Sequence, residues 1–252
     1  MKINIASDRV KLGQAAGQTA ARLILEAIER RGGANIILAT GTSQFETLNQ
    51  LIHEKEIDWS KVAMFHLDEY IGLSITHPAS FRKYLKERFL SKVSPLKAAY
   101  LIDGENDVKA ECDRLGSLIK QHPIDVALVG IGENGHLAFN DPPADFDTDE
   151  PYITVNLDEN CRKQQLGEGW FKSIEEVPRQ AISMSIKQIL KSTHIVCSVP
   201  DKRKALAVKN SVEQPIGNLY PASVLQSHKN CMLFLDQDSA SVLNREKMHA
   251  VE

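Results

Sequence analysis

Residues 124–143 have the sequence IDVALVGIGENGHLAFNDPP, and the fold class can be inferred outward from this stretch. Its first six residues, 124–129, are mostly apolar and predict a strand that is covered on both faces. A loop rich in glycine, asparagine, aspartate and proline follows and extends to about Asp149. Since strands buried on both faces belong mainly to parallel sheets, the stretch indicates an α/β protein.

The rest of the chain repeats this pattern of short β-type runs and amphipathic helical segments. Leu12, Ala16 and Ala20 recur at helical spacing, and Gly32-Gly33 ends that helix. Strands are predicted at 3–5, 34–39, 62–67, 99–102, 124–129, 194–199 and 231–235. Helices are predicted at 11–31, from about 43, at 78–89, 108–119, 181–190 and 202–212. The alternation predicts a mainly parallel sheet with helices on both faces, in a single domain over residues 1–252.

Composition excludes several classes of function. A formal net charge of -3 over 252 residues gives no reason to expect nucleic acid or an anionic membrane as partner. Charges interrupt every candidate membrane span, so we expect a cytoplasmic protein. The four cysteines form no CxxC pair, which disfavours a zinc ribbon or redox motif and predicts buried thiols: Cys112, Cys161, Cys197 and Cys231.

Three loops after predicted strands carry residues suited to chemistry, and in parallel sheets ligands bind at this edge. The first has the sequence ATGTSQ at 39–44. Gly41 permits a tight turn before a helix N-terminus, whose amides can bind an anion, and Thr40, Thr42 and Ser43 add hydroxyls. No Gly-Lys-Ser/Thr follows, so this is not a Walker loop. A phosphate cradle and a plain N-cap at Ser43 both fit the residues.

The second loop, FHLDEY at 65–70, places Asp68 and Glu69 at a strand end. They fit either solvated loop residues or a carboxylate placed for proton transfer. A metal held with His66 is a third hypothesis. Alternation along the strand puts His66 and Asp68 on one face and Glu69 on the other, and no third ligand is evident. We therefore predict no metal here.

The third loop contains a literal GxGxxG at 130–135. A dinucleotide site needs a helix to begin at such a loop, whereas Asn140-Asp141-Pro142-Pro143 would stop a helix almost at once. The motif instead presents His136, with Asn134 and Asp141 nearby. An imidazole exchanges protons near neutral pH, and an amide or carboxylate can fix its tautomer, which favours a catalytic role over a merely structural histidine.

Together these segments resemble the glucosamine-6-phosphate deaminase/isomerase family, which is grouped with the 6-phosphogluconolactonases. The resemblance is carried by ATGTS (39–43), FHLDEYIGL (65–73), HPASF (77–81), GIGENGHLAFNDP (130–142), VPRQAISM (177–184) and DKRKALAV (201–208). It implies a Rossmann-like fold, a sugar phosphate as small-molecule partner, and conversion of glucosamine 6-phosphate and water to fructose 6-phosphate and ammonia. It implies no organic cofactor and no catalytic metal.

The resemblance also implies roles for individual residues. Asp68 matches the base that carries a proton between C2 and C1 of the open-chain sugar, and His136 matches the group that assists ring opening. Asn134 and Asp141 match the partners of His136. The residues that match substrate-binding positions are Thr40, Gly41, Thr42, Ser43, Glu69, Gly135 and Lys204.

Some residues depart from the family pattern. Many members carry Asp in place of Asn134, so the imidazolium of His136 should be less favoured here. Most carry Glu in place of Asp141, whose side chain is one methylene shorter. The segment 167–171 lacks the arginine that helps other members hold phosphate, and it contains Trp170, which fits core packing or a stacking surface. No allosteric arginine, lysine and serine cluster is matched, so we predict no activation by N-acetylglucosamine 6-phosphate.

Several alternatives stay open. A galactosamine-6-phosphate deaminase/isomerase is the nearest rival, followed by a lactonase and by a non-catalytic sugar-phosphate sensor. The segment 141–177 is the candidate lid. The sequence leaves open whether the chain forms a homo-oligomer.

Overall fold

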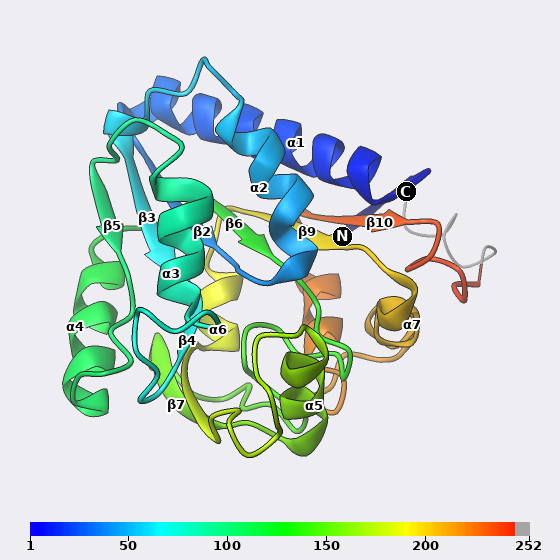
Figure 1. The fold of residues 1–252 in the computed structure, drawn as a ribbon. Helices are drawn as coiled ribbons and strands as arrows, with labels where there is room; N and C mark the ends of the chain where they lie inside the picture. The colour runs from blue at the N-terminus through cyan, green and yellow to red at the C-terminus, as the bar shows by residue number, and fades with distance from the viewer. Residues whose placement is uncertain (245–252) are drawn as a thin grey trace.

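The chain forms one large parallel sheet that contains most of the predicted strands. In the computed structural model, which describes residues 1–244, this sheet has seven strands, and every neighbouring pair is parallel. From edge to edge the strands are β1 (Lys2–Ala6), β10 (Cys231–Asp236), β9 (His194–Val199), β6 (Val126–Val129), β2 (Ala34–Leu38), β3 (Val62–His66) and β5 (Ala98–Tyr100). The predicted α/β fold is confirmed, with β6 at the centre of the sheet (Figure 1).

Helices cover both faces of this sheet, as predicted (Figure 1). One group comprises α1 (Arg9–Arg31), α2 (Phe45–Ile52) and α3 (Phe81–Leu85). The other comprises α4 (Val108–Lys120), α6 (Ile186–Leu190) and α7 (Ala205–Glu213). Side chains of β2 alternate between the two layers: Ile36 and Leu38 pack with α1, and Ile37 packs with the second group. Burial on both faces explains why the strands read as apolar runs.

A second sheet lies beside the first and was not predicted. Its three strands are antiparallel, in the order β4 (Asp68–Tyr70), β8 (Gln180–Met184) and β7 (Tyr152–Asn156). The predicted helix over 181–190 is therefore wrong in its first half, because residues 180–184 pair with strands on both sides. Ser185 caps the helix that does form, α6, by accepting a hydrogen bond from Gln188 N. Local pattern could not reveal the pairing, which joins segments distant in sequence.

Helix ends follow ordinary capping chemistry. Asp8 caps α1 by accepting from Lys11 N, and Gly32 ends the helix with a φ of 79°. The prediction that a helix opens at Pro78 is wrong by one turn: α3 begins at Phe81, after the cap Ser80, and continues as a π-helical turn at Lys86–Leu90. Among the described residues, no helix is both long and apolar enough to cross a bilayer.

Candidate functional site

An open cleft of about 550 Å³ lies at the carboxyl ends of β2, β3 and β6. The chain order along the sheet reverses between β2 and β6, and such a switch point is where open α/β sheets bind ligands. The loops after all three strands, together with α5 (Glu159–Gly167) and Lys204, line the cleft.

The loop after β2 forms one wall. All four predicted residues, Thr40 to Ser43, line the cleft. Gly41 has a φ of 89°, a conformation open to glycine at little cost, and its carbonyl accepts a hydrogen bond from Tyr84 Oη at 3.0 Å. Residues 42–44 then form a 3₁₀ turn that leads into α2. The arrangement offers hydroxyls and helix-terminal amides to one anion.

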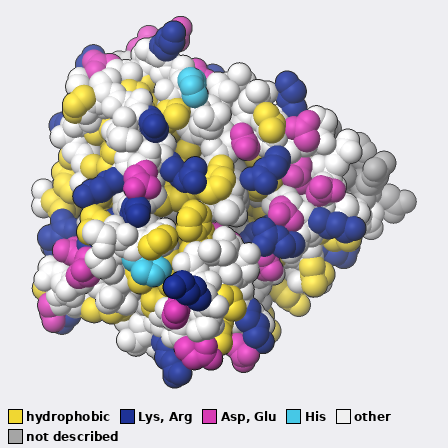
Figure 2. Space-filling model, in the orientation of Figure 1, with side chains coloured by type: hydrophobic (Ala, Val, Ile, Leu, Met, Phe, Trp, Pro, Cys, Tyr) yellow, Lys and Arg dark blue, Asp and Glu magenta, His cyan; other side chains and the backbone are white. Residues whose placement is uncertain are grey.

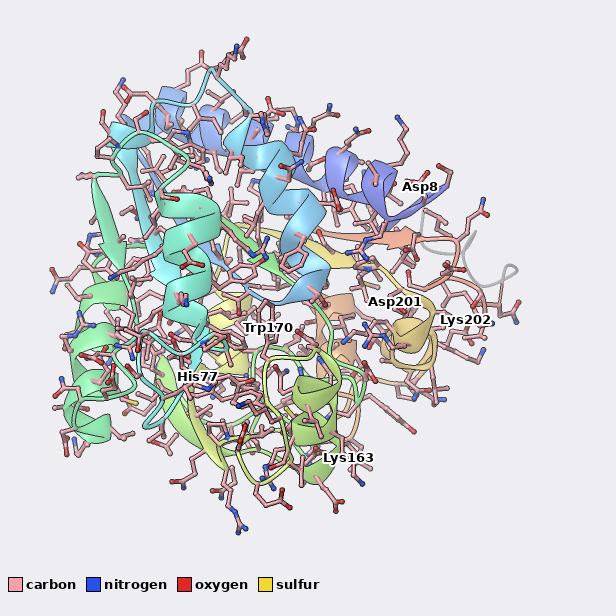
Figure 3. The ribbon with its side chains drawn as sticks, in the orientation of Figure 1. Asp8, His77, Lys163, Trp170, Asp201 and Lys202 are labelled. Atoms are coloured by element: carbon pink, nitrogen blue, oxygen red, sulfur yellow. The ribbon has the colours of Figure 1, made fainter. Side chains whose placement is uncertain are left out.

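Lys204 lies at the same end of the cleft. It ends a 3₁₀ turn, Lys202–Lys204, which Asp201 caps by accepting from Arg203 N. Asp201 has a φ of 88°, a strained value for a residue with a side chain, and its amide donates to the Asp236 carboxylate. Figure 3 labels Asp201 and Lys202 where β9 leads into α7. Burial lowers the pKa of Lys204, and the nearby Glu133 and Glu168 oppose that shift.

Glu168 and Arg9 line this end of the site and were missed from the sequence. Glu168 Oε2 lies 3.8 Å from where a Cβ on Gly41 would be, so a carboxylate faces the anion loop. A second chamber adjoins the cleft at Thr42 and Ser43 and is lined by two further cations, Arg9 and Arg203. Arg9 precedes the first motif by thirty residues, so no local pattern marked it; its guanidinium donates to Thr42 O at 3.3 Å.

The Asp68 side chain stands at the junction of the two sheets. It begins β4, is only 6% exposed, and lines the cleft. Burial raises the pKa of Asp68 to about 8, and the neighbouring Glu69 adds to the rise. A carboxylate with such a pKa is a stronger base than one in water, which suits abstraction of a proton from carbon.

Glu69 points elsewhere, and the prediction that it binds substrate is not supported. Its carboxylate accepts hydrogen bonds from Ser80 Oγ at 2.9 Å and Arg82 N at 2.8 Å. It also accepts from the amides of Tyr70 and Phe81, and it lies outside the cleft lining. As alternation along β4 requires, its side chain takes the opposite face from Asp68 and fixes the start of α3.

The His136 ring is held from two sides. Its Nδ1 lies 2.8 Å from Asp141 Oδ1, which leaves Nε2 for other partners, and the ring lines the cleft. A Cβ on Gly132 would lie 2.2 Å from Nε2, and the imidazole can therefore approach this closely only because residue 132 is a glycine. Residues 136–151 contain no helix, as expected for a loop that does not bind a dinucleotide.

Asn134, Asp141 and Gly135 support the cleft from behind and lie outside its lining. Asn134 Nδ2 donates to Asp141 Oδ1 at 2.9 Å. Burial tends to raise the pKa of Asp141, but hydrogen bonds from His136 and Asn134 outweigh burial and hold the pKa below its usual range. Gly135 has a φ of 90°, and its carbonyl accepts from Ala222 N. Asn134 and Asp141 therefore hydrogen-bond to His136 and to each other, and none of the three residues lines the cleft.

Within residues 1–244, one cluster could supply three metal ligands: His136, Asp141 and Cys161, whose ligand atoms lie within 4.8 Å of one another. Burial raises the pKa of the Cys161 thiol far above its usual range. Since His136 Nδ1 and Asp141 Oδ1 are already bonded to each other, and Asn134 donates to the same oxygen, the cluster is a hydrogen-bonded network. His66, considered earlier as a ligand, is fully buried, and burial lowers its pKa to about 3.

Trp170 follows α5 and is labelled in Figure 3. It is partly buried against an apolar cluster that includes Tyr70, Phe81 and Phe139, and it lies outside the cleft lining. The core-packing interpretation therefore fits Trp170 better than a stacking surface for sugar. Figure 2 shows Lys and Arg interspersed with Asp and Glu over this face.

Comparisons with known proteins agree on one family. Residues 7–234 match the family model described as glucosamine-6-phosphate isomerases/6-phosphogluconolactonase. A glucosamine-6-phosphate deaminase of Lactobacillus delbrueckii subsp. bulgaricus is 37% identical over 247 residues, covering 96% of this chain and all of the relative. One from Streptococcus suis is 38% identical over 248 residues, again covering 96% of this chain and all of the relative.

Solved structures show the same likeness. A structure described as a monomeric glucosamine-6-phosphate deaminase superimposes with a TM-score of 0.87 at 32% identity, covering 96% of this chain and all of the other. A 6-phosphogluconolactonase from Shewanella baltica superimposes with a TM-score of 0.76 at 20% identity, covering 94% and 97%. The second likeness shows a shared fold.

Proposed function

Because the chain belongs to the family of glucosamine-6-phosphate isomerases and 6-phosphogluconolactonases, we propose that it is a glucosamine-6-phosphate deaminase. The reaction would convert glucosamine 6-phosphate and water to fructose 6-phosphate and ammonia. The observation that carries the proposal is that one cleft is lined by Asp68, His136 and the anion loop together. That set matches a base, a proton donor and a phosphate site.

Asp68 is proposed as the base that moves the proton between carbons. Its raised pKa favours uptake of a proton from C2, and its carboxylic acid form can return that proton to C1 on the same face of the sugar. Water then replaces nitrogen at C2 and ammonia leaves. The sugar shows no net change in oxidation level, so the proposal includes no cofactor.

His136 is proposed to open the sugar ring by handling the proton of the ring oxygen. Asp141 holds Nδ1, which presents Nε2 as the nitrogen that exchanges a proton with substrate. Asn134 is proposed to support this pair through Asp141.

The phosphate would lie at the anion loop, between Thr40–Ser43 and Lys204. Arg9 and Arg203, in the adjoining chamber, supply positive charge in the absence of a family arginine near Gly167. Binding energy at this remote group positions the reacting carbons. The segment 141–177, proposed as the lid, contains β7 and α5, and α5 supplies Gln164 and Gln165 to the cleft. We propose the cytoplasm as the compartment.

The test is ammonia release from glucosamine 6-phosphate and galactosamine 6-phosphate, measured side by side with purified protein and no added metal. We expect turnover of the first with a higher kcat/KM than the second. Preference for the second sugar would reassign the substrate. Binding of either sugar without ammonia release would reject the proposal in favour of a sensor.

A further inference from the structure

Asn134 joins two carboxylates behind His136. Its Nδ2 donates to Asp141 Oδ1 at 2.9 Å and to Asp158 Oδ2 at 3.2 Å, so both amide hydrogens are used. Its Oδ1 accepts from His136 N at 3.1 Å. A carboxylate at position 134 could still accept from His136 N but could donate neither of the other bonds.

Asp158 reaches the same pair by a second route, through its backbone. Its N–H donates to Asp141 Oδ2 at 2.9 Å, while its Oδ1 accepts from Cys161 N and caps α5. One oxygen of Asp141 is thus held by His136 and Asn134, and the other by Asp158. Hydrogen bonds thus connect the start of α5 to the Asp141 carboxylate, which holds the His136 imidazole.

We propose that Asp158 is a positioning residue for His136, acting through Asn134 and Asp141. The proposal rests on the proposed function, in which His136 opens the sugar ring. While Asp158 is present, position 134 requires an amide. A carboxylate there would face the carboxylates of Asp141 and Asp158 with no hydrogen-bond donor among the three. Asp141 would then turn from Nδ1, and the imidazole would lose its orientation.

The charges around Asp141 make this requirement specific. The titratable groups facing it are His136 from its own loop, and Asp158 and Cys161 from the start of α5. Since burial raises the pKa of the Cys161 thiol, that group stays neutral. Asn134→Asp would remove a donor from Asp141 and add negative charge beside it, and both changes raise the pKa of Asp141.

The experiment is a cycle of Asn134→Asp, Asp158→Asn and the double variant, made in the full chain. We expect Asn134→Asp to lower kcat about 10- to 100-fold, because it removes part of an acid–base contribution that is typically about 10²–10⁴-fold. KM should change less than about threefold, because the phosphate contacts are untouched. In the double variant the amide at 158 can donate to the carboxylate at 134, so kcat should be no lower than in Asn134→Asp alone.

The controls separate positioning from folding. Asn caps helices as well as Asp does, so Asp158→Asn should preserve α5. Asp107→Asn is the matched control, since Asp107 caps α4 in the same way, is exposed and lies away from the cleft. It should leave kcat unchanged. If Asp158→Asn lowers kcat by the same factor in both backgrounds, the proposal is overturned.

A second measurement needs no substrate. The ¹³C shift of the Asp141 carboxyl carbon, followed against pH, should titrate at higher pH in Asn134→Asp and return toward the original midpoint when Asp158→Asn is added. An unchanged midpoint in Asn134→Asp overturns the proposal. If the unmodified chain releases ammonia from neither sugar phosphate, the proposed function fails, and this titration still decides the role of Asp158.

Discussion

Gly132 and His136 are in such close contact that no side chain fits between them. A Cβ on Gly132 would lie 2.2 Å from His136 Nε2, well inside van der Waals contact, and Gly132 N donates to His136 O at 2.9 Å. The second glycine of the GxGxxG pattern therefore shapes a histidine site. A glycine motif at a strand end can thus allow a side chain, as well as a phosphate group, to come close to the backbone.

Gly132→Ala should displace the His136 ring and lower kcat at least about 100-fold, the scale of a lost acid–base group. Gly116→Ala is the control. Gly116 lies within α4, and a Cβ there would be 3.6 Å from Pro151, an ordinary van der Waals contact. It should keep full activity and gain up to about 1 kcal/mol of stability from helix propensity. Steady-state kinetics and thermal unfolding check both variants. A fully active Gly132→Ala would contradict the proposed role of His136.

Asp68 should give the reaction a rising pH dependence. Because burial raises the pKa of Asp68 to about 8, the base form is scarce at lower pH. We expect kcat/KM to fall about tenfold per pH unit below that value. Asp68→Asn should lower kcat at least about 100-fold and abolish this dependence of kcat/KM on pH. A flat profile from pH 6 to 9 in the unmodified enzyme would contradict the assignment.

The raised pKa of Asp68 predicts that stability, unlike activity, falls as the pH rises. A carboxyl whose pKa is raised on folding contributes stability below its unfolded value, near 3.8, and loses that contribution as pH rises through about 8. Asp68→Asn removes the titration. Its Tm should match that of the unmodified chain near pH 4 and exceed it at pH 9, as differential scanning calorimetry can show. A lower Tm at pH 9 would mean that the ionised Asp68 is stabilised by contacts, not penalised by burial.

How far the sequence could predict this molecule depended on whether the information was local. The strands of the parallel sheet could be predicted because burial on both faces requires a continuous run of apolar residues, as in residues 126–129. The second sheet could not, because β8 is defined by partners more than twenty residues away. Its residues 181–184 therefore looked like the first turn of α6.

The same distinction holds at the site. Asp68, His136, Asn134 and Asp141 stand in recognisable strand-end motifs, and the structure brings them to one region. Asp158, Arg9 and Glu168 come from helix ends whose local sequence indicates capping or solvent exposure. Only packing of α1 and α5 against the cleft gives them a part in it.

Lys204 should be the principal cation for phosphate. It is 6% exposed and lines the cleft, whereas Lys202 in the same turn is exposed. Lys204→Met keeps the aliphatic stem but removes the charge, so KM should rise about 10- to 100-fold, with a smaller change in kcat. Lys202→Met should change KM less than about twofold, since exposed charges contribute little. Equal effects of the two variants would show that phosphate is held by diffuse positive charge.

Glu168 should weaken phosphate binding. Its carboxylate faces Gly41 of the anion loop and reduces the positive potential that Lys204 creates in the cleft. Glu168→Gln keeps the shape and removes the charge, so KM for the sugar phosphate and the inhibition constant for inorganic phosphate should both fall about 3- to 10-fold. The ratio to the unmodified enzyme should shrink as salt is raised, because Glu168 is partly exposed.

Glu159→Gln is the matched control on the same helix. Glu159 pairs with the exposed Lys163, labelled in Figure 3, and lies outside the cleft lining. Both constants should be unchanged in that variant. If Glu168→Gln instead raises KM, the carboxylate must bind a cationic part of the substrate, and the sugar would then lie in the cleft with its amino group, not its phosphate, beside Gly41.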